Sequence, residues 1–187
     1  MNSLWDFAVD FYQHAPIKTA CLTLQDEATA DVCVLLAVVW LGKQGKQLTG
    51  AETALLVSTI EVWQQKMTLP LRQLRKQIKS FIEADYSLDA EPIYQQIKAA
   101  ELQAERVTLE KLQALIDAQR WLSDKIASVA DMADMADVAK IANIENIKSI
   151  ESPVEMNISL YLSQCQATAK ISRPQQWEEV SALFVKY

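Results

Sequence analysis

The chain has 187 residues, half of which are hydrophobic, and carries a formal net charge of −6 at pH 7. It contains 3 glycines and 5 prolines, which excludes collagen-like chains and disordered chains rich in these residues, and argues against a turn-dense β-sandwich. An acidic surface of this kind repels nucleic acid and anionic lipid unless basic residues cluster on part of it.

The N-terminal residues lack the pattern of a secretory signal peptide, because the first lysine is Lys18 and no apolar stretch follows the start. The longest apolar run, residues 32–41, spans ten residues, whereas a membrane-spanning helix needs about 20. The three cysteines (Cys21, Cys33 and Cys165) are odd in number and have no CxxC spacing. We therefore predict reduced thiols, a cytoplasmic location and no membrane insertion.

Capping and proline signals predict three helices near the N-terminus. Ser3 and Asp6 resemble a capping box, with Asp in place of the usual Glu, at the start of the first helix. Pro16 suits the first turn of a second helix. The third helix, over residues 29–41, is apolar on every side, and we expect it to be the central helix, surrounded by the others.

Three more helices are predicted before residue 127. Thr49 and Glu52 form a regular capping box. Helical spacing assigns the fourth helix one apolar face, formed by Leu55, Thr59, Val62, Trp63 and Met67. Pro70 starts a fifth helix, for which we predict an inward face formed by Leu71, Leu74, Ile78 and Phe81. The sixth, residues 91–126, carries two offset apolar stripes, which predicts a bend or break between residues 107 and 112.

Residues 126–150 differ in kind, because an apolar residue recurs at every third position. A helix turns about 100° per residue, so an apolar stripe of period three drifts around the helix and no flat partner surface buries it. The segment is interpreted either as a wrapped interaction segment or solenoid coil, or as a low-complexity insert. A solenoid needs several turns of longer repeats, which favours the insert.

The C-terminal residues predict two more helices. Ser152 and Glu155 form a third capping box, and Pro174 opens a short final helix. We therefore expect an all-α fold, an irregular bundle of six to eight helices with a low-complexity segment before two C-terminal helices. Its parts are a helical core over residues 1–126, the triplet segment over 127–151, and a helical pair over 152–187 that packs on the core.

Three motifs stand out in the N-terminal half: Leu4-Trp5-Asp6-Phe7-Ala8, Cys21-Leu22-x-Leu24-Gln25-Asp26, and Pro70-Leu71-Arg72-x-Leu74-Arg75. With them, this half resembles a family of small bacterial proteins of unknown function. The resemblance covers roughly residues 3–110 and implies an all-helical, cytoplasmic protein. It implies no activity, so no residue role is carried over.

Catalytic and metal-binding combinations are scarce. His14 is the single histidine, and the cysteines are scattered, which disfavours a zinc or iron site. Cys21 lies on the apolar face of its segment, where a thiol stays neutral and is a poor nucleophile. We predict no enzyme, no metal and no cofactor.

The most distinctive charge feature is a basic run without an intervening acid, formed by Lys66, Arg72, Arg75, Lys76 and Lys79. Helical spacing places the last four on one face of the fifth helix. This face is interpreted as a docking surface for an acidic protein, or as an ordinary solvated face. RNA is disfavoured, because no aromatic residue is interleaved for base stacking.

The sequence thus favours a non-catalytic protein-interaction function, such as an adaptor or regulator, and leaves homo-oligomer formation open. The alternative is a small hydrophobic ligand held between the first three helices. Its predicted pocket is lined by Trp5, Cys21, Gln25 and Trp40.

Overall fold

The computed structural model describes residues 3–84, 90–121, 152–169 and 182–187. Within these ranges the chain is helical and has no strand, which confirms the all-α prediction. The helices are α1 (Leu4–Gln13), α2 (Ala15–Ala28), α3 (Val32–Lys43), α4 (Gly50–Trp63), the π-helical turn η1 (Gln64–Thr68), α5 (Leu69–Glu83), α6 (Glu91–Ala118) and α8 (Pro153–Ala169). Residues 182–186 form one more helical turn. The predicted triplet segment, residues 127–151, lies outside the described residues.

The capping signals act as predicted. Ser3 Oγ accepts a hydrogen bond from the Asp6 N–H at 3.1 Å at the start of α1. Thr49 and Glu52 form a reciprocal capping box at the start of α4. At the start of α8, the Ser152 N–H donates to Glu155 and the Glu155 N–H donates to Ser152 Oγ. Each pair satisfies backbone donors that a helix N-terminus otherwise leaves unpaired.

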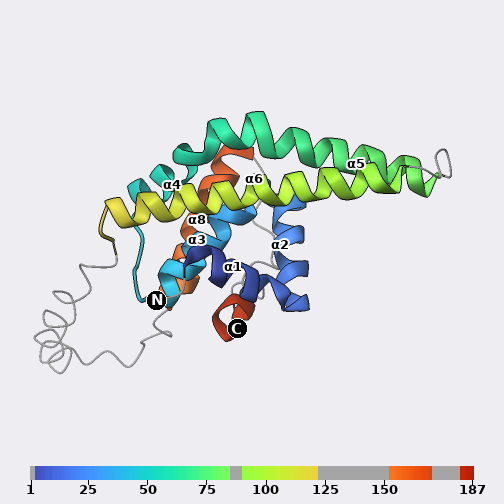
Figure 1. The fold of residues 1–187 in the computed structure, drawn as a ribbon. Coiled ribbons are helices and arrows are strands. Elements are labelled where there is room, and N and C mark those ends of the chain that lie inside the picture. The colour runs from blue at the N-terminus through green and yellow to red at the C-terminus, as the bar shows by residue number, and fades with distance from the viewer. Residues whose placement is uncertain (1–2, 85–89, 122–151, 170–181) are drawn as a thin grey trace, which may run out of the picture.

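The central position predicted for α3 is confirmed, since all residues from Cys33 to Gly42 are buried. Helices α1, α2, α4, α6 and α8 all contact α3, and Figure 1 shows it in the middle of the molecule with α8 alongside. Phe184, from the C-terminal helical turn, is fully buried and packs its ring against Phe11 at a centroid distance of 5.7 Å.

The contact between α3 and α8 depends on a glycine and on a buried amide. A Cβ at Gly42 would lie 2.7 Å from the Val154 Cα, so the two backbones pack closer than a side chain allows. One turn further along α8, Asn157 is fully buried. Its amide accepts from the Leu48 N–H and donates to the Val38 and Lys46 carbonyls. The amide thereby fixes the α3–α4 connection on α8.

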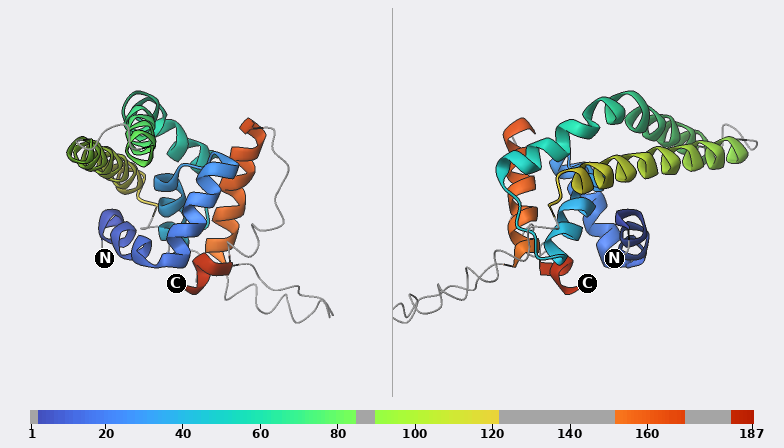
Figure 2. Two further views of the ribbon diagram at one scale, coloured as in Figure 1. Left: turned by 90° about the vertical axis from the view of Figure 1, so that its right-hand side faces the viewer. Right: turned by 60° about the vertical axis from the view of Figure 1, so that its left-hand side comes forward.

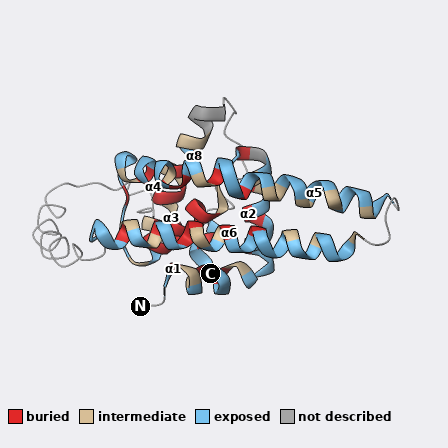
Figure 3. Cartoon of the chain, turned by 45° about the horizontal axis from the view of Figure 1, so that its top comes forward, coloured by how far each residue is buried: buried red, intermediate tan, exposed pale blue. Residues whose placement is uncertain are grey.

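Helices α5 and α6 pack side by side and extend away from this core (Figures 1 and 2). We call α5 and the N-terminal half of α6 the arm. No residue of α5 is buried, and Figure 3 shows the arm mostly exposed while the buried residues gather around α3. Helix α6 is continuous from Glu91 to Ala118, so the predicted break between residues 107 and 112 is wrong. Its two apolar stripes are offset because its first half packs on α5 and its second half on the core.

The apolar face predicted for the fourth helix is not its buried face, and the inward face predicted for the fifth is only partly correct. In α4 the buried residues are Thr53, Leu56 and Ile60, whereas Leu55 and Val62 of α4 and Met67 of η1 stay exposed. In α5, Leu71 and Ile78 are half-buried, but Leu74 and Phe81 are 41% and 55% exposed. The arm turns part of the apolar side of α5 toward solvent, for reasons that lie in its charged contacts with α6.

We expect Gly42→Ala to destabilise the fold by about 2 kcal/mol or more, because the new methyl group meets backbone that cannot move without separating α3 from α8. The matched control is Gly50→Ala, where the nearest atom to the new Cβ is a flexible side chain at 3.9 Å. Chemical denaturation of both variants measures the difference. Equal stabilities would show that the α3–α8 contact is not as tight as described.

Candidate functional site

The two helices of the arm meet along a seam of eight half-buried or buried residues. Four come from α5 and four from α6, and their spacings alternate between three and four residues, as in a coiled coil. The seam residues are Leu71, Arg75, Ile78 and Ile82 of α5 and Tyr94, Ile97, Glu101 and Ala104 of α6. The arm is thus a two-helix antiparallel hairpin with one ion pair, between Arg75 and Glu101, inside an otherwise uncharged seam.

A network of two arginines and two glutamates joins α5 to α6 at the base of the arm. Both arginines donate to the Glu101 carboxylate, Arg72 at 3.0 Å and Arg75 through Nε and Nη2. Arg72 also reaches the Glu105 carboxylate at 2.8 Å. The side chains of Arg72 and Glu101 are only 11% and 7% exposed. Burial alone would raise the pKa of Glu101, but the hydrogen bonds from Arg75 and Arg72 hold it below its usual value.

The network continues toward the core as a group of buried and half-buried ionisable side chains near the start of α3. Asp31 caps α3 by accepting from the Cys33 and Val34 N–H groups, and its pKa is raised because it is buried. Burial likewise raises the pKa of Glu105 despite its contact with Arg72. The Tyr161 hydroxyl of α8 accepts from the Asp31 N–H at 2.7 Å and donates to the Asp31 carbonyl.

The thiols of this region are held in the neutral form. The described cysteines are all free. Burial raises the pKa of Cys21 to about 12 and that of Cys33 well above its usual value, so neither is a thiolate near neutral pH. Among the described residues, no group of three or more His, Cys, Asp and Glu side chains is placed to hold a metal ion.

The structure divides the predicted basic face. Arg72 and Arg75 are half-buried in the hairpin network rather than exposed beside Lys76 and Lys79, and binding of an acidic protein by the five basic residues stays a prediction. The two arginines turn inward because Glu101 and Glu105 oppose them. Lys66, Lys76 and Lys79 are exposed. Of these, Lys76 pairs with Asp26 of α2 at 3.6 Å, and Lys79 pairs with Glu83 at 3.3 Å.

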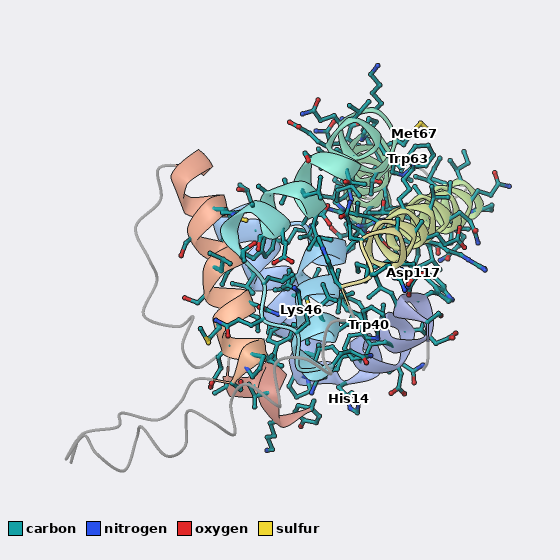
Figure 4. All side chains as sticks on the ribbon, turned by 90° about the vertical axis from the view of Figure 1, so that its left-hand side faces the viewer. His14, Trp40, Lys46, Trp63, Met67 and Asp117 are labelled. Atoms are coloured by element: carbon teal, nitrogen blue, oxygen red, sulfur yellow. The ribbon has the colours of Figure 1, made fainter. Side chains whose placement is uncertain are left out.

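The predicted pocket residues are spread over different environments. Cys21 and Trp40 are buried in the hydrophobic core, and Gln25 is half-buried on α2. Trp5 instead lines a groove of about 370 Å³ between α1 and α6, where the Arg106 guanidinium lies 5.2 Å from its ring centroid. Figure 4 shows Trp40 among the central helices, whereas Trp63 and Met67 lie beside α5 and α6.

One surface, on the side of the arm that faces away from α1 and α2, was not predicted from the sequence. In an antiparallel hairpin, the residues that directly precede the seam residues of both helices lie on the same side. Here they are Pro70, Leu74, Gln77, Phe81, Ile93, Gln96, Ala100 and Gln103. We call this set the outer face. All eight residues are exposed and none is charged.

The opposite side of the arm has a different character. The residues that directly follow the seam residues are Arg72, Lys76, Lys79, Glu83, Gln95, Lys98, Leu102 and Glu105, of which six are charged. The contacts of this side run toward the core, as between Lys76 and Asp26. Charge spacing along α5 and α6 could have revealed this asymmetry, but only once the two helices are known to pair.

The family described as “Protein of unknown function (DUF2390)” matches residues 3–112, a range that includes the arm and ends within α6. Neither the curated proteins nor the solved structures include a significant match to the chain. Among the described residues, no helix has the length and hydropathy needed to cross a membrane.

We expect Glu101→Gln to lower the free energy of unfolding by about 3 kcal/mol, because it leaves Arg72 and Arg75 partly buried without their carboxylate. The control is Glu110→Gln, which removes an exposed pair with Arg106 and should cost less than about 0.5 kcal/mol. Denaturant titration at neutral pH distinguishes the two. Similar losses would mean that the arm is not held by Glu101.

Glu101→Gln should also change how the free energy of unfolding depends on pH in the acidic range. Because the pKa of Glu101 is lowered in the folded state, its contribution is complete above the pKa of the unfolded chain and is lost as the pH falls through the folded value. The wild type should therefore lose more stability than Glu101→Gln between about pH 5 and pH 3. Parallel profiles would contradict this assignment.

Proposed function

We propose a function from the geometry alone, since the chain belongs to a family described only as “Protein of unknown function (DUF2390)”. The protein is a non-catalytic protein-interaction module that docks its partner on the outer face of the arm. The observation that carries the proposal is the orientation of α5, which turns Leu74 and Phe81 outward while Arg75 lies in the seam.

This orientation runs against the usual preference of an amphipathic helix. Burying a side chain such as Leu74 or Phe81 stabilises a fold by about 1.5–3 kcal/mol. The arm leaves both exposed, together with Ile93, which is 54% exposed. Apolar side chains that gather on one surface of a soluble protein typically mark an interaction site.

The π-helical turn η1, directly before α5, supports the same interpretation. It lies where α4 passes into α5. Within it, the buried side chains of Gln64 and Thr68 have no hydrogen-bond partner among the described residues. Each unpaired buried group costs about 1–3 kcal/mol. π-Turns often occur at functional sites, and a departure from the most stable arrangement is expected where function selects the conformation.

The non-catalytic part of the proposal is supported by the neutral state of Cys21 and Cys33 and by the way Arg72, Arg75 and Glu101 satisfy one another. A cytoplasmic location is supported by the three free cysteines, which suit a reducing compartment.

The outer face is expected to contribute little to the stability of the isolated protein. Phe81→Ser and Leu74→Ser should each change the free energy of unfolding by less than about 1 kcal/mol, because both side chains are already exposed. The comparison variant is Ile78→Ser in the seam, which should lose more. Thermal unfolding followed by circular dichroism measures all three. A large loss for Phe81→Ser would make this residue structural.

A photo-reactive side chain tests docking on the outer face directly. When it replaces Gln77, and the chain is present at its cellular concentration, it should give one discrete cross-linked product with the partner protein. Phe81→Glu should abolish that product. The same side chain at Lys79, on the opposite side of α5, is the matched control and should give none. Equal products from both positions, or a product that survives Phe81→Glu, would contradict the proposal.

A further inference from the structure

Resting on the proposed docking role of the outer face, we infer that its occupant is a second copy of this chain. Two arms pack with their outer faces together, so that four helices form one bundle. Three properties of the outer face point to this partner: its heptad spacing, its lack of charge and the chemistry of its polar residues.

The outer face repeats the spacing of the seam. On α5 the residues 70, 74, 77 and 81 are separated by four, three and four positions, and on α6 the residues 93, 96, 100 and 103 by three, four and three. This is the spacing with which helices pack in coiled coils and four-helix bundles. Each helix of the arm therefore carries two such stripes, one used in the seam and one on the outer face.

The absence of charge allows the face to pair with itself. A two-fold interface sets the same patch of both copies together, so a charged patch would bring like charges into contact. The chain as a whole has a net charge of −6, and the opposite side of the arm is mostly charged. The outer face has no acidic or basic residue among its eight positions, so self-pairing carries no such repulsion.

The polar residues of the outer face are also self-complementary. They are the glutamines Gln77, Gln96 and Gln103. A glutamine amide offers both donors and an acceptor, so two identical side chains that meet across an interface can hydrogen-bond to each other. Between the glutamines lie the apolar residues Leu74, Phe81, Ile93 and Ala100, which supply the area to be buried.

The size of the face fits a reversible dimer. Helix α5 has 15 residues, about 22 Å at 1.5 Å per residue, and two adjacent helices are about 20 Å wide. Taken as a flat surface, the outer face thus covers roughly 450 Å² on each copy. Both copies together thus lose roughly 900 Å², which is below the range of specific, stable interfaces, about 1,200–2,000 Å², and within that of weak, transient ones. We therefore expect a dissociation constant in the micromolar range.

Sedimentation velocity of the full-length chain tests the inference. From about 1 to about 100 µM, the range that such an interface implies, the mass should rise from one chain to two. Phe81→Glu should weaken dimerisation at least tenfold, since it buries a charge, while Lys79→Glu on the opposite side should leave it unchanged. Circular dichroism establishes that both variants remain folded.

A pair of charge variants makes the test specific for self-pairing. One variant carries Gln77→Glu with Gln96→Glu, and the other carries Gln77→Lys with Gln96→Lys. Each alone should be monomeric, because like charges would face each other, and an equal mixture should recover the dimer. A mixture that stays monomeric while the wild type dimerises would overturn face-to-face packing.

The remaining outcomes separate this inference from the proposed function. A wild type that stays monomeric, yet cross-links from Gln77 to a different protein, overturns the second copy and leaves the docking face standing. A dimer unaffected by Phe81→Glu uses another surface and overturns the second copy on this face. A monomer without any cross-linked product overturns both.

Discussion

The contact on which the arm depends is the pairing of Arg75 and Arg72 with Glu101. Rotating α5 by one residue, about 100°, would turn Leu74 and Phe81 toward α6 and would gain a few kcal/mol of apolar burial. It would also withdraw Arg75 from a carboxylate that is only 7% exposed. An uncompensated buried charge costs about 3–5 kcal/mol. The ionic cost therefore matches or exceeds the apolar gain, and the ion pairs select the orientation that leaves the apolar side outward.

The core provides a fixed base for this arm. The close approach of α3 and α8 at Gly42, the buried amide of Asn157 and the hydrogen bonds between Tyr161 and Asp31 all converge on α3. The base of the arm reaches the same region, because Arg72 pairs with Glu105 and the Cys33 thiol of α3 lies 3.9 Å from the Glu105 carbonyl. The position of the arm is therefore set by ionic and polar contacts at its base, while its outer half is free of the core.

The sequence predicts the helices well and the orientation of two of them poorly. Boundaries at Ser3, Thr49 and Ser152 follow from local hydrogen bonds between a cap and the residue three positions on, so local sequence suffices. The inward side of α5 does not follow from local sequence. Hydrophobic periodicity weighs each side chain by itself, and it places Arg75 in water. What brings Arg75 inside is Glu101, 26 residues later, and that partner is visible only after the two helices are paired.

The predicted break in α6 failed for a related reason. A helix that changes neighbours along its length needs an apolar stripe that changes direction, and the stripe then looks interrupted although the helix is continuous. In α6 the residues Glu101 and Ala104 face α5, while Leu112 and Ile116 face the core. The basic run does mark the arm, because four of its five residues lie on α5. The sequence alone did not show that two of them, Arg72 and Arg75, hold the hairpin together through Glu101.

The orientation of α5 against α6 thus determines where the charged residues and the exposed apolar residues of the arm lie. With Arg75 in the seam and Arg72 beside it, the charged residues of the arm lie between its helices and toward the core, and the neutral glutamines and apolar residues lie outside. A patch of this size, interrupted by glutamines, is small enough for a soluble monomer, and the net charge of −6 opposes nonspecific aggregation. The same interruption limits the hydrophobic gain on docking, which makes association through this face reversible and dependent on concentration.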